Sequence, residues 1–267
     1  MNPLYQSAIS PCPNDIFIFS GILSGQCQWP DELKNFTFLD IQELNSKAML
    51  QKAGLIKVSF AAMSKLSEHY TMLESGAAMG FGCGPLVLSR KNEPIQAGMR
   101  IGIPGWQTTA WLLFRRYFSH IIDSQNKDQI KQIVFHDLEN ALLNHEIDLA
   151  LIIHETRFSY DQNQLTKVSD LGELWEKDTS LPIPLGGICL HHSLSHLKSQ
   201  VEEGILQSLD FAQANQDKAI ALCREYAQDM DPEVIRSHIN LYVNSFSYQI
   251  GENGHRALAL LRDGINS

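Results

Sequence analysis

The chain has 267 residues, of which 44% are hydrophobic and 19% are charged, and this is the composition of an ordinary globular protein. Its formal net charge of −9 argues against nucleic acid and against an anionic membrane surface as partners. No apolar run approaches the roughly 20 residues that cross a bilayer, so we expect no membrane insertion. The length allows one large domain or two lobes of about 100–150 residues each.

The five cysteines are scattered along the chain and show no paired CxxC spacing. An odd, scattered set is typical of reduced thiols and not of a disulfide framework or a zinc site. The first residues carry no basic side chain ahead of an apolar core, so we predict no secretory signal. Together these features predict a cytoplasmic protein.

The first two thirds of the chain alternates short β-rich runs with helical patterns. Strands are predicted at residues 7–10, 36–41, 56–60, 86–88, 100–103, 133–135, 147–154 and 183–190. Helices are predicted between them at residues 14–24, 42–52, 61–72, 108–118 and 138–145. Such alternation predicts an α/β fold with largely parallel sheets.

From about residue 197 onward the apolar residues recur at helical spacing, and a last helix is predicted at 251–265. An α/β body with a helical tail fits a two-lobed shell whose C-terminal helices pack back on the first lobe. We predict hinges near residues 90–93 and 186–190. The predicted division is 1–88 for the first part of lobe 1, 89–188 for lobe 2, and 189–267 for the return to lobe 1.

The apolar run that starts at Ile147 ends at His154, so one imidazole is predicted at the C-terminal edge of a strand. Ligands bind at that edge in open α/β sheets, and histidine accepts a proton near neutral pH. His154 is therefore the first candidate for a general base. A buried, hydrogen-bonded histidine that ends a strand explains the pattern about equally well. Arg157 either serves the substrate or pairs with Glu155 or Asp161.

A turn with two prolines, from Ser10 to Asp15, separates the first strand from the first helix. Asn14 or Asp15 is placed to cap that helix, whose free N–H groups then face a ligand crevice. A capped turn without a ligand explains the segment about as well. Cys12 is a weaker candidate for a nucleophile, because the sequence offers no partner base for it.

Two further segments predict an anion site. Lys57 and Ser59 alternate on one face of a strand, where a cation and a hydroxyl could hold a carboxylate. A solvated Lys57 and a capping Ser59 are the likelier interpretation on local grounds. In the second segment, the hydroxyls of Thr108 and Thr109 and the N–H groups of Thr109 and Ala110 open a helix after a Gly/Pro turn, and they would converge on an anion.

Two other patterns predict no chemistry. The glycine-rich run 80–84 leads into a strand, whereas a dinucleotide fingerprint opens a helix, so we interpret it as a flexible turn. His191, His192 and His196 lack an acidic ligand at a suitable spacing and are predicted to form a surface cluster without a metal.

An ordered set of segments between about residues 10 and 251 is similar to the 1,4-dihydroxy-6-naphthoate synthase family of the futalosine route to menaquinone. Each segment alone is weak, but their common order along the chain is specific. The segments are residues 10–15 with 17–19, 57–62, 82–87, 104–105 with 108–110, 151–158, 181–186 and 242–247.

The resemblance implies a fold like the type II periplasmic binding proteins, with two α/β lobes around a ligand cleft. It implies cleavage of cyclic dehypoxanthine futalosine to 1,4-dihydroxy-6-naphthoate and dihydroxyacetone, with a small aromatic carboxylate as the partner and no cofactor. The family's base matches His154. Its substrate contacts match the segment Lys57, Val58 and Ser59 and the turn at Thr108, Thr109 and Ala110. Ser10 and Asn14 could stabilise developing negative charge.

Two other functions stay open at this point. A solute-binding or sensor protein for an aromatic carboxylate would use the same two lobes without chemistry. An enzyme like chorismate dehydratase, from the same pathway, would share the fold. The segment from His154 to Phe158 favours the naphthoate synthase, and the sequence leaves a homodimer open.

Overall fold

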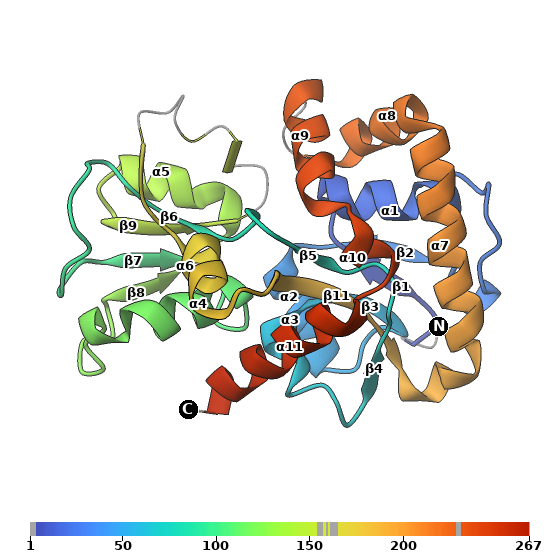
Figure 1. The fold of residues 1–267 in the computed structure, drawn as a ribbon, viewed down its shortest axis with the longest axis horizontal. Helices are drawn as coiled ribbons and strands as arrows, with labels where there is room; N and C mark the ends of the chain where they lie inside the picture. Colours follow the sequence, from blue (N-terminus) through green and yellow to red (C-terminus); the bar gives the residue numbers. More distant parts are fainter. Residues whose placement is uncertain (1–3, 154–156, 159, 161–164, 228–230, 267) are drawn as a thin grey trace.

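The computed structural model describes residues 4–153, 157–158, 160, 165–227 and 231–266. Two β-sheets lie side by side, each covered by its own helices, so the described part of the chain forms two lobes (Figure 1). The lobes and the α/β class agree with the predicted fold. None of the helices in the described ranges is long and apolar enough to cross a membrane.

The first lobe is built on a sheet with strand order β2-β1-β3-β11-β4, in which β5 also pairs with β11. Its strands are β1 (Ser7–Ile9), β2 (Phe36–Phe38), β3 (Leu55–Ser59), β4 (Tyr70–Met72), β5 (Ala78–Gly80) and β11 (Ile183–His191). Its helices are α1 (Pro13–Leu23), α2 (Ile41–Met49), α3 (Phe60–Met63), α7 (Lys198–Ala214), α8 (Gln216–Tyr226), α9 (Pro232–Tyr242), α10 (Ser245–Tyr248) and α11 (Gly251–Asn266), with 3-10 turns at Asp31–Leu33 and His192–Leu197.

The second lobe is built on a sheet with strand order β10-β6-β9-β7-β8. Its strands are β6 (Leu86–Ser89), β7 (Ile101–Ile103), β8 (Ile130–Gln132), β9 (Leu149–Ile152) and β10 (Thr166–Asp170). Its helices are α4 (Thr109–Phe118), α5 (Leu138–Leu143) and α6 (Leu171–Thr179), with 3-10 turns at Ser119–Ile121 and Phe135–Asp137.

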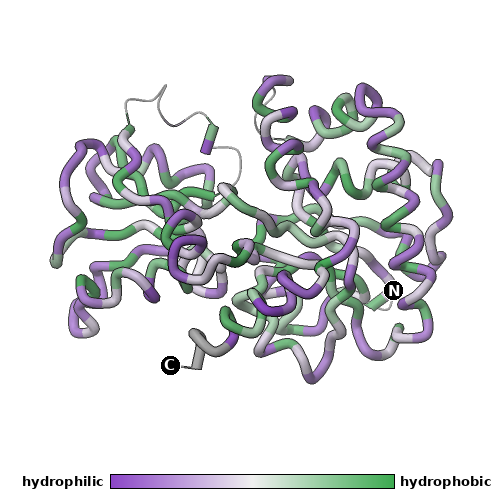
Figure 2. Tube along the Cα trace, viewed as in Figure 1, coloured by the Kyte–Doolittle hydropathy of each residue, from purple (hydrophilic) through white to green (hydrophobic). Residues whose placement is uncertain are grey.

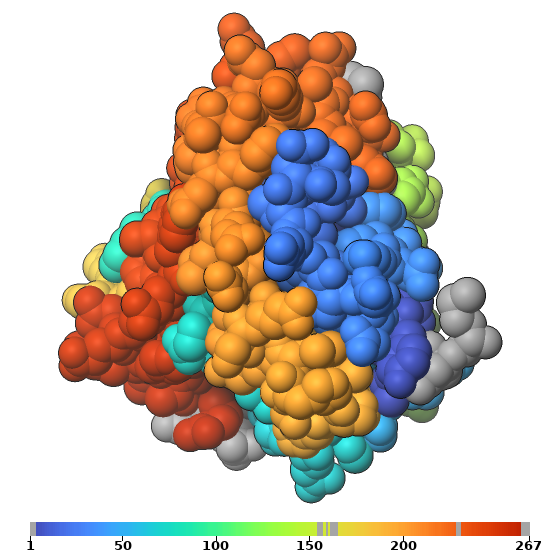
Figure 3. Space-filling model, turned by 90° about the vertical axis from the view of Figure 1, so that its right-hand side faces the viewer, coloured from blue at the N-terminus to red at the C-terminus, as the bar shows by residue number. Residues whose placement is uncertain are grey.

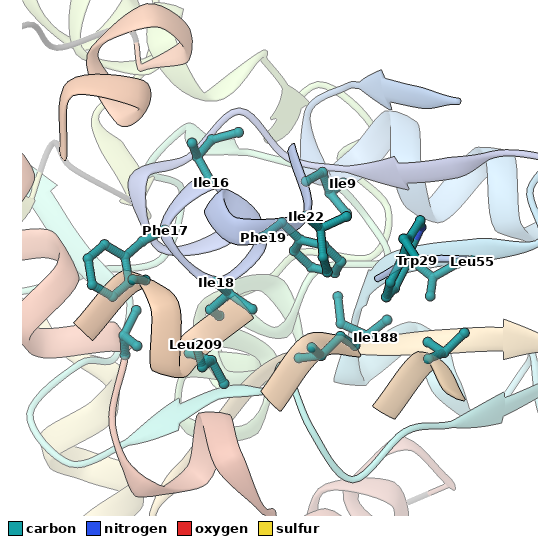
Figure 4. Close-up of a cluster of buried hydrophobic side chains, with 14 of the residues drawn as sticks. Ile9, Ile16, Phe17, Ile18, Phe19, Ile22, Trp29, Leu55, Ile188 and Leu209 are labelled. Atoms are coloured by element: carbon teal, nitrogen blue, oxygen red, sulfur yellow. The ribbon is translucent and has the colours of Figure 1, made fainter. Parts of the chain in front are cut away.

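Helix α1 is the centre of the first lobe and is buried along almost its whole length. A helix that is buried along its length needs several neighbours, and α7, α8 and α9 pack against it. Its side chains Phe17, Phe19 and Ile22 lie in one apolar cluster with Trp29 and Leu209 (Figure 4). Along the chain, hydrophobic colour gathers on the central strands and alternates on the outer helices (Figure 2).

The C-terminal helices pack back on the first lobe, as predicted. Helix α7 lies against α1, although about 180 residues separate them in the sequence, and the Ser208 hydroxyl accepts a hydrogen bond from the Gly21 N–H at 2.9 Å. On the end face of this lobe, the orange C-terminal helices lie beside the blue N-terminal segments (Figure 3). The position of α1 therefore depends on packing between the two ends of the chain.

The prediction of largely parallel sheets is wrong. Strand pairing is parallel for β1–β2, β1–β3, β7–β8 and β7–β9. It is antiparallel for β3–β11, β11–β4, β11–β5, β6–β9 and β6–β10. The antiparallel pairs all involve β6 or β11, the strands with which the chain enters the second lobe and returns to the first. A strand that arrives from the other lobe need not follow the direction of the local βαβ units.

The same two strands shift the lobe boundaries from the predicted positions. All of β6 pairs within the second sheet and all of β11 within the first, whereas the predicted boundaries after residues 88 and 188 cut both strands. The connections between the sheets are residues 81–85 and 180–182. The predicted hinges, at 90–93 and 186–190, lie instead beside β6 in the second lobe and inside β11.

Two local predictions are corrected by strand pairing that cannot be seen in the sequence. The predicted helix at 61–72 is the short α3, followed by turns and by strand β4, which pairs with β11. The predicted strand at 133–135 is replaced by β8, three residues earlier, because Ile130 pairs with Ile101 while Val134 is exposed. Strands β5 and β10 and helix α6 were not predicted.

Candidate functional site

A cleft between the two lobes encloses about 690 Å³, including the part that is open to solvent. The first lobe contributes the β1–α1 turn, the end of β3, β11 and α9, and the second contributes the start of α4 and the end of β9. The lining residues are Ser10, Asn14, Asp15, Ile41, Lys57, Ser59, Ala78, Cys83, Gly84, Pro85, Thr108, Thr109, Ala110, Ile152, Ile153, Arg157, Leu185, Gly186, His238 and Tyr242.

Most of the predicted site residues meet in this cleft. They come from four separate segments and are Ser10, Asn14, Lys57, Ser59, Thr108, Thr109, Ala110 and Arg157. Val58 does not line the cleft, because strand alternation points its side chain into the apolar core of the first lobe. His154 lies outside the described residues. The residues before it, Ile152 and Ile153, line the cleft.

Lys57 forms a buried ion pair with Asp15. Its Nζ lies 2.6 Å from Asp15 Oδ1, and the two side chains are 5% and 1% exposed. The other carboxylate oxygen, Oδ2, accepts a hydrogen bond of 2.7 Å from the Ser10 hydroxyl. The interpretation of Lys57 as a solvated lysine is therefore wrong. Its charge is compensated inside the protein, which reduces its value as a clamp for a ligand carboxylate.

The predicted helix caps in this region are also corrected. Helix α1 begins at Pro13, so Asn14 and Asp15 lie inside its first turn and no side chain caps it. The Asn14 amide instead donates to Asp15 Oδ1 at 2.9 Å. Ser59 precedes α3, but its hydroxyl accepts from the Asn45 amide at 3.1 Å rather than capping the helix. The polar groups thus hold one another along the cleft wall.

The start of α4 faces the cleft from the second lobe. The Thr108 hydroxyl accepts from the Trp111 N–H and donates to the Gly105 carbonyl at 2.7 Å. The Thr109 hydroxyl donates to the Leu185 carbonyl of the first lobe at 2.9 Å. Both hydroxyls are thus engaged by the protein, and the donors that α4 offers an anion are the N–H groups of its first turn.

Contacts between the lobes surround the same region. Gln42 of α2 donates to the Gln107 side chain at 3.3 Å, and Asn45 donates to the Gln107 carbonyl at 3.4 Å. With the bond from Thr109 to Leu185, these contacts join the turn before α4 to the first lobe. The relative position of the lobes therefore decides which donors face the cleft together.

Glu155 and Asp161, the acidic partners of Arg157 that were considered from the sequence, lie outside the described residues. The Arg157 guanidinium donates to the Gly84 carbonyl and, at 2.8 Å, to the buried carboxylate of Asp170. Gly84 lies in the connection between the sheets, so Arg157 ties the segment after β9 to that connection. Its charge is compensated by Asp170, as that of Lys57 is by Asp15.

The described cysteine and histidine groups favour no other chemistry. Desolvation by burial raises the pKa of Cys83 to about 12, so this thiol stays protonated and is a poor nucleophile. The glycine-rich run 80–84 leads into β6 and not into a helix, as predicted. His191 bonds to Ser193 and Gln51 at the surface, and the described residues contain no cluster of three metal-binding side chains.

Sequence reasoning missed His238 and Tyr242, which reach the cleft from α9. The His238 Nε2 atom lies 3.0 Å from Asn14 Oδ1, and its ring centroid lies 4.5 Å from that of Tyr242. In the sequence they lie on the apolar face of a C-terminal helix, and only tertiary packing brings them to α1. Their spacing predicted only that they lie on one face of a C-terminal helix.

Comparisons with known proteins identify the family to which this chain belongs. A family model described as menaquinone biosynthesis matches residues 5–266. A 1,4-dihydroxy-6-naphtoate synthase from Thermus thermophilus is 38% identical over 256 residues, which cover 94% of this chain and 90% of the relative. The chain belongs to the 1,4-dihydroxy-6-naphthoate synthase family of menaquinone biosynthesis. A synthase of the same name from Streptomyces coelicolor is 36% identical over 254 residues, 95% of this chain and 89% of the relative.

Solved structures place the fold among the periplasmic binding proteins. A protein from Archaeoglobus fulgidus superposes with a TM-score of 0.89 at 28% identity, covering 98% of this chain and 97% of that one. The periplasmic aliphatic sulphonate binding protein from Escherichia coli has a TM-score of 0.66 at 10% identity, covering 98% and 85%. The predicted two-lobed, periplasmic-binding-protein-like fold is confirmed.

Proposed function

We propose that this protein is a carbon–carbon lyase that converts cyclic dehypoxanthine futalosine to 1,4-dihydroxy-6-naphthoate and dihydroxyacetone. His154 is the general base, and no cofactor takes part. The observation that carries the proposal is the cleft itself, in a chain of this family. Residues from both lobes converge on one space, which is bordered by the strand that leads to His154.

The lining of the cleft suits a flat aromatic acid. Apolar side chains that include Ile41, Ile152 and Leu185 can enclose a ring system. The first turn of α4 offers N–H groups and the positive end of a helix dipole to a carboxylate. Because Lys57 and Arg157 are already paired with buried carboxylates, these neutral donors are the better carboxylate site.

The chemistry needs a base and a protected space. Removal of a proton by His154 starts the cleavage, and the electron pair of the breaking carbon–carbon bond leaves on the three-carbon fragment. That fragment takes up a proton, in the end from solvent, and becomes dihydroxyacetone, while His154 returns its proton to solvent. Formation of the aromatic naphthalene ring supplies driving force. Enclosure between two lobes excludes water and aligns the reacting carbon with the base. A positioned base of this kind contributes about 10²–10⁴-fold in rate.

The test is turnover of cyclic dehypoxanthine futalosine by the purified protein, followed by the absorbance of the naphthoate product. His154→Ala should lower turnover at least about a hundredfold and keep the affinity for 1,4-dihydroxy-6-naphthoate. His145→Ala, a change of another histidine of the second lobe that does not line the cleft, is the matched control. Near-normal turnover by the His154 variant would remove it as the base.

A solute-binding or sensor protein is the second candidate, because the fold is shared with periplasmic ligand-binding proteins. Tight binding of the futalosine precursor without any product would favour it. Consumption of chorismate instead would indicate an enzyme like chorismate dehydratase. A cytoplasmic location and a homodimer stay predictions, to be checked by fractionation and by light scattering.

A further inference from the structure

Asn45 is a buried amide side chain behind the cleft wall to which the proposed function gives no role. It lies on α2 and is 0% exposed, and a buried amide needs hydrogen-bond partners. Its side chain makes three hydrogen bonds. Two of them join it to Ser59 at the end of β3, and one joins it to Gln107 in the turn before α4. Asn45 therefore contacts both lobes.

The partners of Asn45 fix which end of its amide faces which group. The Ser59 backbone N–H can only donate, so the atom 2.9 Å from it is the amide oxygen. The Gln107 carbonyl can only accept, so the atom 3.4 Å from it is the amide nitrogen. That nitrogen also lies 3.1 Å from the Ser59 hydroxyl oxygen, and its two protons serve these two acceptors. The two bonds to backbone groups exclude a flipped amide.

The bond from Asn45 determines what the Ser59 hydroxyl can do. A serine hydroxyl has one proton to donate and accepts through its oxygen. The oxygen of Ser59 accepts from Asn45, and within the described part of the chain no residue accepts the hydroxyl proton. Ser59 lines the cleft, so this proton is available to a ligand there. Asn45 thus holds Ser59 as a hydrogen-bond donor.

The same amide nitrogen places Ser59 next to the start of α4. Gln107 lies in the turn that leads into this helix, and the following Thr109 and Ala110 line the cleft from the second lobe. The N–H groups of Thr109 and Ala110 belong to the first turn, where a helix offers no acceptor, and they find none elsewhere among the described residues. Three unused donors, one from the first lobe and two from the second, are therefore held together by Asn45.

We propose that Asn45 is a positioning residue that builds one carboxylate site from both lobes, an inference that takes its ligand from the proposed function. Asn45 directs the Ser59 proton into the cleft and, through Gln107, holds the first turn of α4 beside it. A substrate carboxylate accepts from both. These donors are neutral, which agrees with the pairing of Lys57 with Asp15. Asn45 does not itself line the cleft, so it acts through Ser59 and Gln107.

The test measures binding of 1,4-dihydroxy-6-naphthoate by calorimetry and compares it with binding of 1,4-dihydroxynaphthalene, which lacks the carboxylate. Ser59→Ala should weaken naphthoate binding about 10–100-fold, the range for a lost hydrogen bond to a charged group, and change diol binding less than about threefold. Asn45→Ala should weaken naphthoate binding selectively as well. In the Ser59→Ala background, Asn45→Ala should cause little further loss, because its partner hydroxyl is already absent.

Asn45→Asp is the second variant, because it keeps the shape of the side chain and the bond to the Ser59 N–H. Its carboxylate accepts the Ser59 proton and cannot donate to the hydroxyl, so naphthoate binding should be at least as weak as in Ser59→Ala. Asn253→Asp, at an exposed position of α11, is the matched control and should keep the affinity of the unchanged protein. In turnover of the futalosine substrate, the Asn45 and Ser59 variants should raise KM and change kcat by less than about threefold.

The outcomes separate this inference from the proposed function. If the unchanged protein binds the naphthoate but forms none from the futalosine precursor, the proposed lyase fails and the carboxylate site stands. If it does not bind the naphthoate, both fail. Equal losses for the naphthoate and the diol, or losses from Asn45→Ala and Ser59→Ala that multiply in the double variant, overturn the role of Asn45. Circular dichroism shows which variants are folded, and if Asn45→Ala is not, normal naphthoate binding by Asn45→Asp overturns it.

Discussion

The buried ion pair between Lys57 and Asp15 predicts a large loss of stability in Asp15→Asn. The carboxylate accepts hydrogen bonds from Lys57 at 2.6 Å, from the Ser10 hydroxyl at 2.7 Å and from the Asn14 amide at 2.9 Å. The substitution removes the charge but leaves the Lys57 ammonium, 5% exposed, without its counterion. Breaking a buried pair in this way costs about 3–5 kcal/mol. That is a large part of the roughly 5–15 kcal/mol that stabilises a typical native protein.

The measurement is guanidinium unfolding at pH 7, followed by circular dichroism. Asp217→Asn is the matched control, because its ion pair with Arg236 is at the surface, with Asp217 95% exposed. Such a pair contributes at most about 1 kcal/mol. Replacing both members of the buried pair, by Asp15→Leu with Lys57→Met, should recover part of the loss, since no unpaired charge then remains.

Two results would refute this reasoning. If Asp15→Asn loses no more stability than Asp217→Asn, water or other groups compensate the Lys57 charge, and the pair is not buried in solution. If the double variant is less stable than Asp15→Asn, the unpaired ammonium is not the source of the loss. Either result would also weaken the argument that Lys57 is unavailable to a ligand carboxylate.

The remaining predictions concern the second lobe and the lobe contact. Hydrogen bonds from Arg100, with help from Arg90, lower the pKa of Asp148 to about 2. The pKa of this carboxyl is near 4 in the unfolded chain, so its lower pKa in the folded protein stabilises the fold above about pH 4. This stabilisation is lost as the pH falls toward 2. Asp148→Asn should therefore lower the free energy of unfolding by about 2 kcal/mol at pH 7, measured in urea. The difference in stability between the variant and the unchanged protein should narrow below about pH 4, and a difference that does not change with pH would contradict this. Thr109→Val removes the bond to the Leu185 carbonyl and should raise KM several-fold with little change in kcat, so an unchanged KM would argue against a role of that contact in binding.

The sequence predicted the segments of the cleft better than their roles. The turns at Ser10–Asp15 and at Thr108–Ala110, and the strand end at Ser59, were identified from local chemistry and meet in one site. Their hydrogen-bond partners were not predictable, because each lies far away in sequence. The Thr109 hydroxyl bonds to Leu185, and Lys57 bonds to Asp15. From the local sequence, Lys57 was predicted to be solvated or to bind a ligand carboxylate, and Thr109 was predicted to bind an anion at the start of a helix.

Helix and strand periods determined the α/β class, the C-terminal helices and the position of most elements, because these depend on residues close together in the chain. Strand direction and the limits of the lobes depended on β6 and β11, whose pairing joins distant segments. The position of His238 also depends on contacts between distant segments. Its spacing places it on the apolar face of a helix, and the packing of α9 on α1 brings it to the cleft. Neighbouring residues therefore specify the local elements and carry the family's motifs, whereas contacts between distant segments specify which charges are paired and which donors face the cleft.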